Sequence, residues 1–159
     1  MTPALQSGMF NGIPFNQLDF QSGAVVIGAA TTEQTLKIAE DLFDFLNNAL
    51  GFRKLPENRP RTYASILIAD LGPVLSNMFS RWEKITSLVQ KMMPPENRLL
   101  PMGVKFLTYK GNDAQADRQF IFERRVPTPP NEDWIFSQAP LDTETHVKVL
   151  EMIQTEFGK

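Results

Sequence analysis

The stretch that decides the fold class is residues 23–51, GAVVIGAATTEQTLKIAEDLFDFLNNALG. It begins with a short apolar run that predicts a buried strand over 23–30. Thr31 follows, with Gln34 three residues later, which is the pattern of a capping box at the start of a helix. Gly51 supplies the stop, because glycine readily adopts the left-handed conformation that ends many helices. The apolar positions expected on one face of this helix are Leu36, Ala39, Phe43, Leu46 and Leu50.

A second strand and a second helix follow in the same order. Residues 62–69, TYASILIA, predict a strand. Three consecutive apolar residues, 66–68, place this strand in the middle of a sheet, because both of its faces are apolar. The helix after it is expected to begin near Pro73, which suits a first helical turn, and to end before Pro94.

This second helix carries a long apolar stripe. Its apolar residues alternate at spacings of three and four, as in a heptad pattern. They are Leu75, Met78, Trp82, Ile85, Val89 and Met92. A helix that lies on a sheet needs such a stripe, and so does a seam between two subunits. The pattern is compatible with both interpretations.

The C-terminal half adds two strands and a helix. Residues 103–110 and 118–126 predict a hairpin, with turn-forming residues between them. Residues 127–140 predict a proline-rich loop, and the last helix is expected to begin near Asp142 or Thr143. This order fits the α+β class, with a mixed or antiparallel sheet of four to five strands packed with three helices. We expect residues 23–159 to form a single α+β domain.

Residues 1–22 differ in composition from the rest of the chain. They carry a single charge, yet they contain Phe10, Phe15 and Phe20. Alternating apolar residues indicate a strand for part of the segment, and Pro14 favours a sheet edge or an irregular structure. We therefore expect an apolar N-terminal arm or edge strand ahead of the domain.

Composition narrows the chemistry that the chain can perform. Its 159 residues include 16 basic and 18 acidic ones, no cysteine and one histidine, His146. The lack of cysteine excludes disulfides, thiolate metal sites and cysteine nucleophiles, and we expect no metal or other cofactor. The longest apolar run, 24–30, is far below the ~20 residues that cross a bilayer. The N-terminus also lacks the basic region of a secretory signal, so we expect no membrane contact and a cytoplasmic location.

Two residues could support a small carboxylate-dependent enzyme. Asp70 closes an apolar strand, a position where ligands collect in open α/β sheets. His146 lies near Asp142 and Glu144, either of which could orient it as a general base. The simpler interpretations are a helix cap for Asp70 and, for His146, a structural role at a helix start, either solvated or hydrogen-bonded to the preceding loop. No nucleophile or phosphate-binding loop accompanies them, so we expect no catalytic residue.

Residues 53–61 contain a basic cluster. Its positive charges are Arg53, Lys54, Arg59 and Arg61. Such a cluster could contact an anionic ligand or bind nucleic acid weakly. The formal net charge of the whole chain is only −2. A nucleic-acid partner is not favoured, because a nearly balanced charge creates no global field toward a phosphate backbone.

The leading hypothesis is a non-enzymatic protein that works by binding another protein. Large apolar side chains in poorly charged or proline-braced segments make good anchors, because little entropy is lost when they dock. The candidate partner-binding residues are Phe10, Phe15, Phe20, Trp134, Ile135 and Phe136. We expect either a subunit of a larger bacterial or phage-type assembly or a small inhibitor or immunity-type protein. The partner is then another protein or a second copy of the chain in a homo-oligomer.

Overall fold

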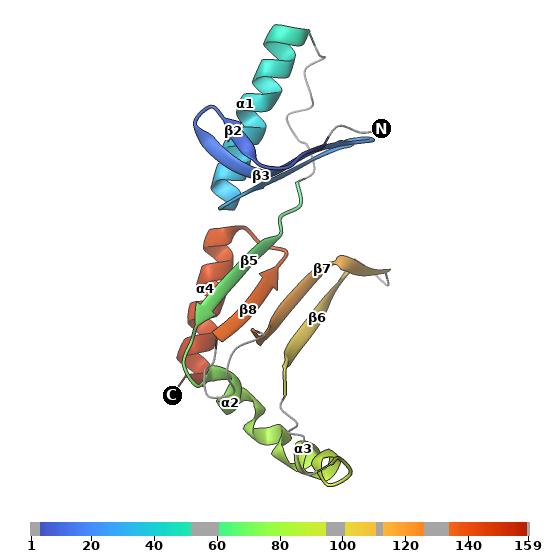
Figure 1. Ribbon diagram of the computed structural model, residues 1–159, viewed down its shortest axis with the longest axis vertical. Coiled ribbons are helices and arrows are strands. Elements are labelled where there is room, and N and C mark those ends of the chain that lie inside the picture. The colour runs from blue at the N-terminus through green and yellow to red at the C-terminus, as the bar shows by residue number, and fades with distance from the viewer. Residues whose placement is uncertain (1–3, 52–60, 95–100, 111–112, 126–133, 159) are drawn as a thin grey trace. The chain divides into compact units, whose positions relative to one another are not determined.

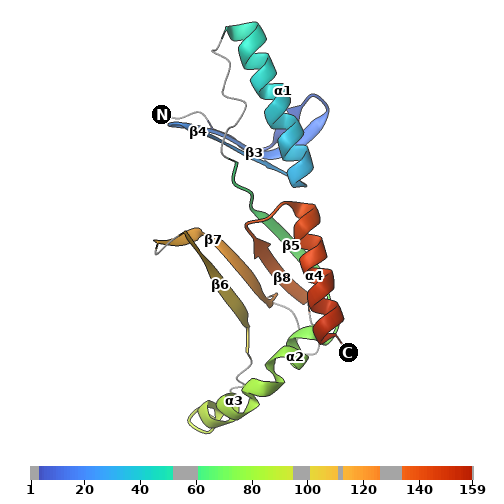
Figure 2. The same cartoon turned by 180° about the vertical axis from the view of Figure 1, so that it is seen from behind.

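The computed structural model describes residues 4–51, 61–94, 101–110, 113–125 and 134–158 (Figures 1 and 2). The chain divides into two compact units, Met1–Ser65 and Ile66–Lys159. Each unit has a four-stranded sheet and an apolar cluster of its own. The α+β class with a multi-strand antiparallel sheet is therefore confirmed. The strands form two sheets, where the sequence suggested one.

The sheet of the first unit is built around one long central strand. Its strands are β1 (Ala4–Leu5), β2 (Gly8–Phe10), β3 (Ile13–Gln21) and β4 (Ala24–Ala29). Strands β1 and β2 pair with the two halves of β3 along one edge, and β4 pairs with its other edge. All pairs are antiparallel. The N-terminal segment is thus an integral part of this sheet.

Turn chemistry explains how the N-terminal segment folds back on itself. Asn11 and Gly12 connect β2 to β3 with positive φ angles of 46° and 79°, which these two residue types tolerate and which hairpin turns require. Pro14 lies beyond the last pair between β3 and β4, Phe15 with Ala29. Its missing N–H therefore removes no hydrogen bond from that ladder.

A bulge in β3 reconciles two apolar alternations that are out of phase. Phe15 and Leu18 are three residues apart, so a regular strand would send them to opposite faces. The register between β3 and β4 shifts between Phe15 and Gln17. This extra residue brings Phe15 and Leu18 to the same side, and both are buried in one cluster.

Helix α1 (Thr32–Leu50) packs on this sheet. The predicted caps are confirmed: the Thr31 hydroxyl accepts a hydrogen bond from the backbone N–H of Gln34 at 3.3 Å, and Gly51 ends the helix with a φ of 65°. The buried face differs from the predicted stripe, because Ile38 and Leu42 are the apolar residues that the helix buries most deeply. The residues packed around them are Phe10, Ile13, Phe15, Leu18, Phe20, Val25, Ile27, Ala29 and Leu46.

The sheet of the second unit has the order β5–β8–β7–β6. Its strands are β5 (Ser65–Asp70), β6 (Gly103–Lys110), β7 (Asp113–Arg124) and β8 (Trp134–Ala139). Strands β6, β7 and β8 pair antiparallel, and Figure 1 shows β5 and β8 running in opposite directions. The prediction of a central strand over 62–69 is wrong, because β5 is an edge strand. The second half of the predicted loop 127–140 is also a strand, β8.

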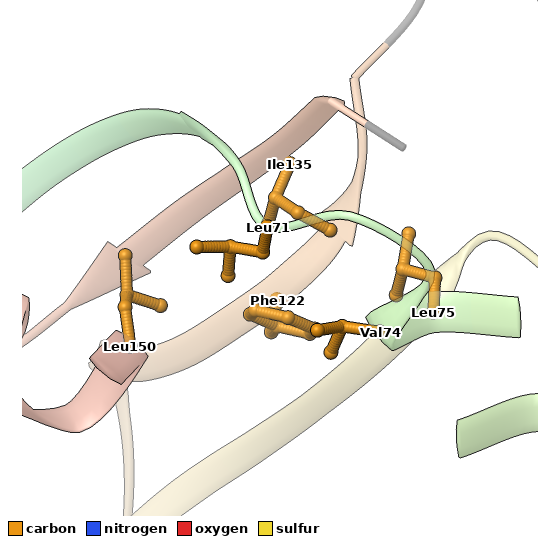
Figure 3. Packing of buried hydrophobic residues seen from close by; sticks show 6 residues of the cluster. All are labelled: Leu71, Val74, Leu75, Phe122, Ile135 and Leu150. Atoms are coloured by element: carbon orange, nitrogen blue, oxygen red, sulfur yellow. The ribbon is translucent and has the colours of Figure 1, made fainter. Parts of the chain in front are cut away.

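The helices of the second unit are α2 (Val74–Phe79), α3 (Glu83–Gln90) and α4 (Thr143–Phe157). A 3-10 turn, Ser80–Trp82, separates α2 from α3 and divides the predicted helix in two. Helices α2 and α4 lie against each other, and the Asn77 side-chain amide donates a hydrogen bond to the Phe157 carbonyl at 2.7 Å. Figure 3 shows the core that they share with the sheet. Its buried members are Leu71, Val74, Leu75, Phe122, Ile135 and Leu150.

Candidate functional site

The apolar stripe of the second helical segment leaves the core partway along its length. Leu75 is fully buried in the cluster of the second unit, and Met78 packs against that cluster. Farther along, Ile85 has 55% of its surface exposed, although it continues the same spacing. The other large apolar side chains exposed on this part of the chain are Trp82, Leu88, Val89 and Met92. We call this set, Ile85 included, the α3 face.

The break before α3 has a local cause. The Ser80 hydroxyl donates a hydrogen bond to the Asn77 carbonyl at 2.9 Å, and the Thr86 hydroxyl donates one to the Trp82 carbonyl at 3.1 Å. Hydroxyls that bond carbonyls of the preceding turn bend helices. The 3-10 turn between these two bonds separates α3 from α2 and its core contacts. Figures 1 and 2 show α3 continuing away from the sheet beyond α2.

An open apolar groove adjoins the α3 face. One wall consists of Phe79, Trp82, Ile85 and Thr86, and the other is the segment Pro101–Val104 at the start of β6. Its volume is about 310 Å³. Met102, in the second wall, is exposed. The groove is large enough for one or two bulky side chains, and none of the described residues that line it is charged.

The predicted partner-binding residues near Trp134 are divided between the two faces of β8. Ile135 is fully buried in the core, whereas Trp134 has 37% of its surface exposed and Phe136 is half-buried. Side chains alternate along a strand, so Trp134 and Phe136 lie on the face opposite the core. Ile66 and Ile68 of β5 alternate in the same way, because Leu67 and Ala69 pack against the core cluster.

The three phenylalanines of the N-terminal segment all pack in the first unit. Phe15 is buried, and Phe10 and Phe20 are half-buried against the same cluster. In this conformation they stabilise the sheet–helix core of their own unit. The hypothesis that they anchor a partner gains no support from their positions.

His146 is fully buried in α4, with a polar partner on the sheet. Its Nε2 lies 2.8 Å from the Ser137 hydroxyl oxygen, and the Ser137 hydroxyl donates to the Ile121 carbonyl at 3.0 Å. With that donation made, the imidazole is the donor to Ser137, and the serine is not activated as a nucleophile. Burial lowers the pKa of His146, which favours the neutral ring. Its position agrees with the structural interpretation.

The acids around His146 are hydrogen-bonded to other residues. Asp142 caps α4 by accepting hydrogen bonds from the backbone N–H and the hydroxyl of Thr145, both at 2.8 Å, and these bonds lower the pKa of Asp142. Glu144 forms an ion pair with Lys148. Neither bond fits the expected role of orienting His146 as a general base.

Asp70 is exposed at the end of β5. Its carboxylate accepts a hydrogen bond from the Gly72 N–H at 3.0 Å, and the residue at the N-cap position of α2 is Pro73. Asp70 therefore forms a local turn and not the predicted helix cap. The lining of the groove beside the α3 face includes neither Asp70 nor His146.

The remaining expectations from the sequence concern the basic cluster at 53–61, a metal site and a membrane-spanning segment. Arg53, Lys54 and Arg59 lie outside the described residues, and Arg61 is exposed. Among the residues that the structure describes, no three His, Asp or Glu side chains gather as metal ligands would, and no helix is long and apolar enough to cross a membrane. Comparisons with protein-family models, curated proteins and solved structures find no match to this chain.

Proposed function

We propose that this protein works by binding another protein, and that the α3 face is its main docking surface. Its biological role is that of a subunit in a larger bacterial or phage-type assembly or of a small inhibitor or immunity-type protein. The observation that carries the proposal is the exposure of the second half of an apolar stripe whose first half is buried.

The energetics favour a covering partner. Full burial of one aliphatic side chain contributes about 1.5–3 kcal/mol, and Ile85, Leu88 and Val89 contribute little of that while they remain exposed. A helix as short as α3 is marginal by itself in water. Packing against a partner would stabilise both the apolar face and the helix that carries it.

The adjoining groove gives the surface a suitable shape. Binding energy concentrates where an aromatic or aliphatic side chain fills a desolvated pocket. Trp82 and Ile85 form one wall of such a pocket. We infer a partner that places a bulky apolar side chain between α3 and Pro101–Val104, with helix-in-groove packing along the exposed stripe.

The test is a comparative purification of the tagged full-length chain from its native cells. Ile85→Glu places a charge in the centre of the α3 face, and Ser87→Glu places the same charge on the opposite side of the same helix. We expect a specific protein to be retained by the wild type and by Ser87→Glu, and to be depleted at least tenfold with Ile85→Glu. Circular dichroism should show all three chains equally folded.

Two results would count against the proposal. One is a set of copurifying proteins that is unchanged by Ile85→Glu, which would mean that the α3 face does not bind them. The other is a wild-type chain that retains no specific protein. For any partner that is found, calorimetry with purified components should give similar affinities for the wild type and Ser87→Glu and a weaker affinity for Ile85→Glu.

A further inference from the structure

Strand β5 is an edge strand without the usual protection against pairing. Among the described strands it has a neighbour, β8, on one side only. Natural edge strands discourage pairing with lysine, proline or bulges, and Ser65–Asp70 contains no basic residue and no proline. Ile66 is 60% exposed and Ile68 is 49% exposed. Among the described residues, this edge is therefore apolar and open to another strand.

A second groove runs beside this edge. It has a volume of about 230 Å³ and lies between β5 and α4. Its lining residues are Leu67, Ile68, Ala69 and Leu71 on the strand side and Val147, Leu150 and Glu151 on α4. Val147 remains 40% exposed. A strand added to β5 would place every second side chain beside this groove, because side chains alternate between the two faces.

The sequence of β5 is nearly the same in both directions. Around Leu67, the order is Ala-Ser-Ile-Leu-Ile-Ala-Asp over residues 64–70. In an antiparallel pair centred on Leu67, Ile66 lies opposite Ile68 of a second copy, and Ser65 lies opposite Ala69. Such a pair is isologous, since both copies contribute the same surface. At its centre it sets Leu67 against Leu67 on one face and Ile66 against Ile68 on the other.

The alternative registers that keep the two faces aligned place polar residues opposite large apolar ones. A pair centred on Ile68 places Asp70 opposite Ile66, and a pair centred on Ile66 places Ser65 opposite Leu67. In the Leu67-centred register, Asp70 lies opposite Ala64, so no like charges face each other. A self-complementary edge favours a second copy of this chain over an unrelated peptide. The sequence of an unrelated peptide is not expected to be complementary to residues 64–70.

We infer that two copies of this protein pair through β5, and that their second-unit sheets join into one continuous antiparallel sheet. The two α4 helices then lie on the same face of the joined sheet, with Val147 of each near the twofold axis. This inference deepens the proposed function by naming one partner as the chain itself. It uses an edge separate from the α3 face, so each proposal can fail without the other.

The first test is the oligomeric state of the full-length chain by analytical ultracentrifugation. Ile66→Lys places a charge on the β5 edge strand, and Leu107→Lys is the matched control on the other edge strand, β6, where Leu107 is similarly exposed. We expect a dimer for the wild type, for Leu107→Lys and for Ile85→Glu. The dissociation constant of Ile66→Lys should rise at least tenfold.

The second test uses the absence of cysteine from the chain. In the proposed register, Leu67→Cys lies directly opposite its own copy, whereas Ile66→Cys is displaced from its copy by two residues, at about 7–8 Å. Mild oxidation should therefore link Leu67→Cys into a covalent dimer much faster than Ile66→Cys. Equal rates would overturn the register.

A chain that is monomeric up to about 100 μM would overturn the inference, and so would a dimer that Ile66→Lys leaves intact. If that monomer still loses a heterologous partner with Ile85→Glu, the α3 proposal survives and only the β5 pairing fails. If the dimer forms and no other partner is found, the β5 pairing is supported and the α3 proposal fails.

Discussion

Helices α2 and α3 carry one apolar stripe, and the two parts of that stripe have opposite environments. In α2, Val74 and Leu75 are fully buried beside Phe122 of the sheet. In α3, Ile85 and Val89 continue the same spacing and are exposed. Periodicity determines which side of a helix is apolar. It does not determine what covers that side, because the cover comes from residues far away in the sequence.

The position of each helix on the sheet accounts for the difference. Helix α2 is held against α4 by the bond from Asn77 to Phe157 and lies over the apolar core. Helix α3 begins after a 3-10 turn that separates it from that core. The sequence pattern predicted a sheet-packed helix or a subunit seam as alternatives. The sheet-packed alternative holds for α2, and we propose that the seam alternative holds for α3.

The largest loss of stability is expected from a substitution in α2, the buried part of the apolar stripe. Leu75→Ala should lower the free energy of unfolding by about 2–5 kcal/mol, because it removes a buried side chain and leaves a cavity. Leu88→Ala makes the same chemical change on the α3 face and should cost less than about 0.5 kcal/mol in the isolated chain. Urea denaturation, followed by circular dichroism, measures both. Similar losses for the two variants would remove the distinction between α2 and α3.

A smaller loss of stability is expected when the hydrogen bond between Ser137 and His146 in the same core is removed. Ser137→Ala removes the hydroxyl that lies 2.8 Å from His146 Nε2 and leaves a buried imidazole group without that partner. The expected cost is about 1–3 kcal/mol. Ser137→Thr retains a hydroxyl and serves as the conservative control, although its extra methyl group must be accommodated. A Ser137→Ala variant as stable as the wild type would show that the pair contributes no net stability.

Local signals were sufficient to predict several elements. The N-cap at Thr31, the stop at Gly51 and the bounds of Gly103–Lys110 depend on neighbouring residues alone, and the structure confirms all three. The second half of the predicted capping box is not formed, because the buried Gln34 Oε1 has no hydrogen-bond partner among the described residues. Strand β8 was missed, because prolines precede it and an inward-facing serine interrupts its apolar alternation. That serine is explained only by His146, which lies on another element. The edge position of β5 depends likewise on the other strands of the sheet.

The candidate site was only partly predictable for the same reason. The spacing of Trp82, Ile85 and Val89 was visible in the sequence, but their exposure depends on where α3 leaves the sheet. Trp134 was predicted to bind a partner, and the structure leaves part of its side chain exposed. Ile135, its neighbour, is a core residue, because adjacent positions on a strand face opposite ways.

Protonation of His146 is expected to make the core of the second unit sensitive to acid. Burial holds the pKa of His146 below its ordinary value of 6.5, so the unfolded chain binds a proton at a higher pH than the folded one does. Stability should therefore be full above about pH 6.5 and should fall as the pH drops below that value. His146→Gln should flatten this dependence between pH 7 and pH 5. If the wild type and His146→Gln change equally over that window, protonation of His146 is not the cause.

The smallest change in stability is expected from a substitution in α3, the exposed part of the apolar stripe. Val89→Ala removes a β-branched side chain from an exposed helical position, where alanine has the higher helix propensity. The small loss of packing should be offset by that gain, so the free energy of unfolding should change by less than about 0.5 kcal/mol in either direction. Urea denaturation of the isolated chain measures this directly. The same variant should weaken binding to a partner that covers α3, because the exposed part of the Val89 side chain is buried only in the complex. A loss of stability above about 1 kcal/mol in the isolated chain would mean that Val89 already packs within its own molecule, and the contrast between α2 and α3 would then disappear.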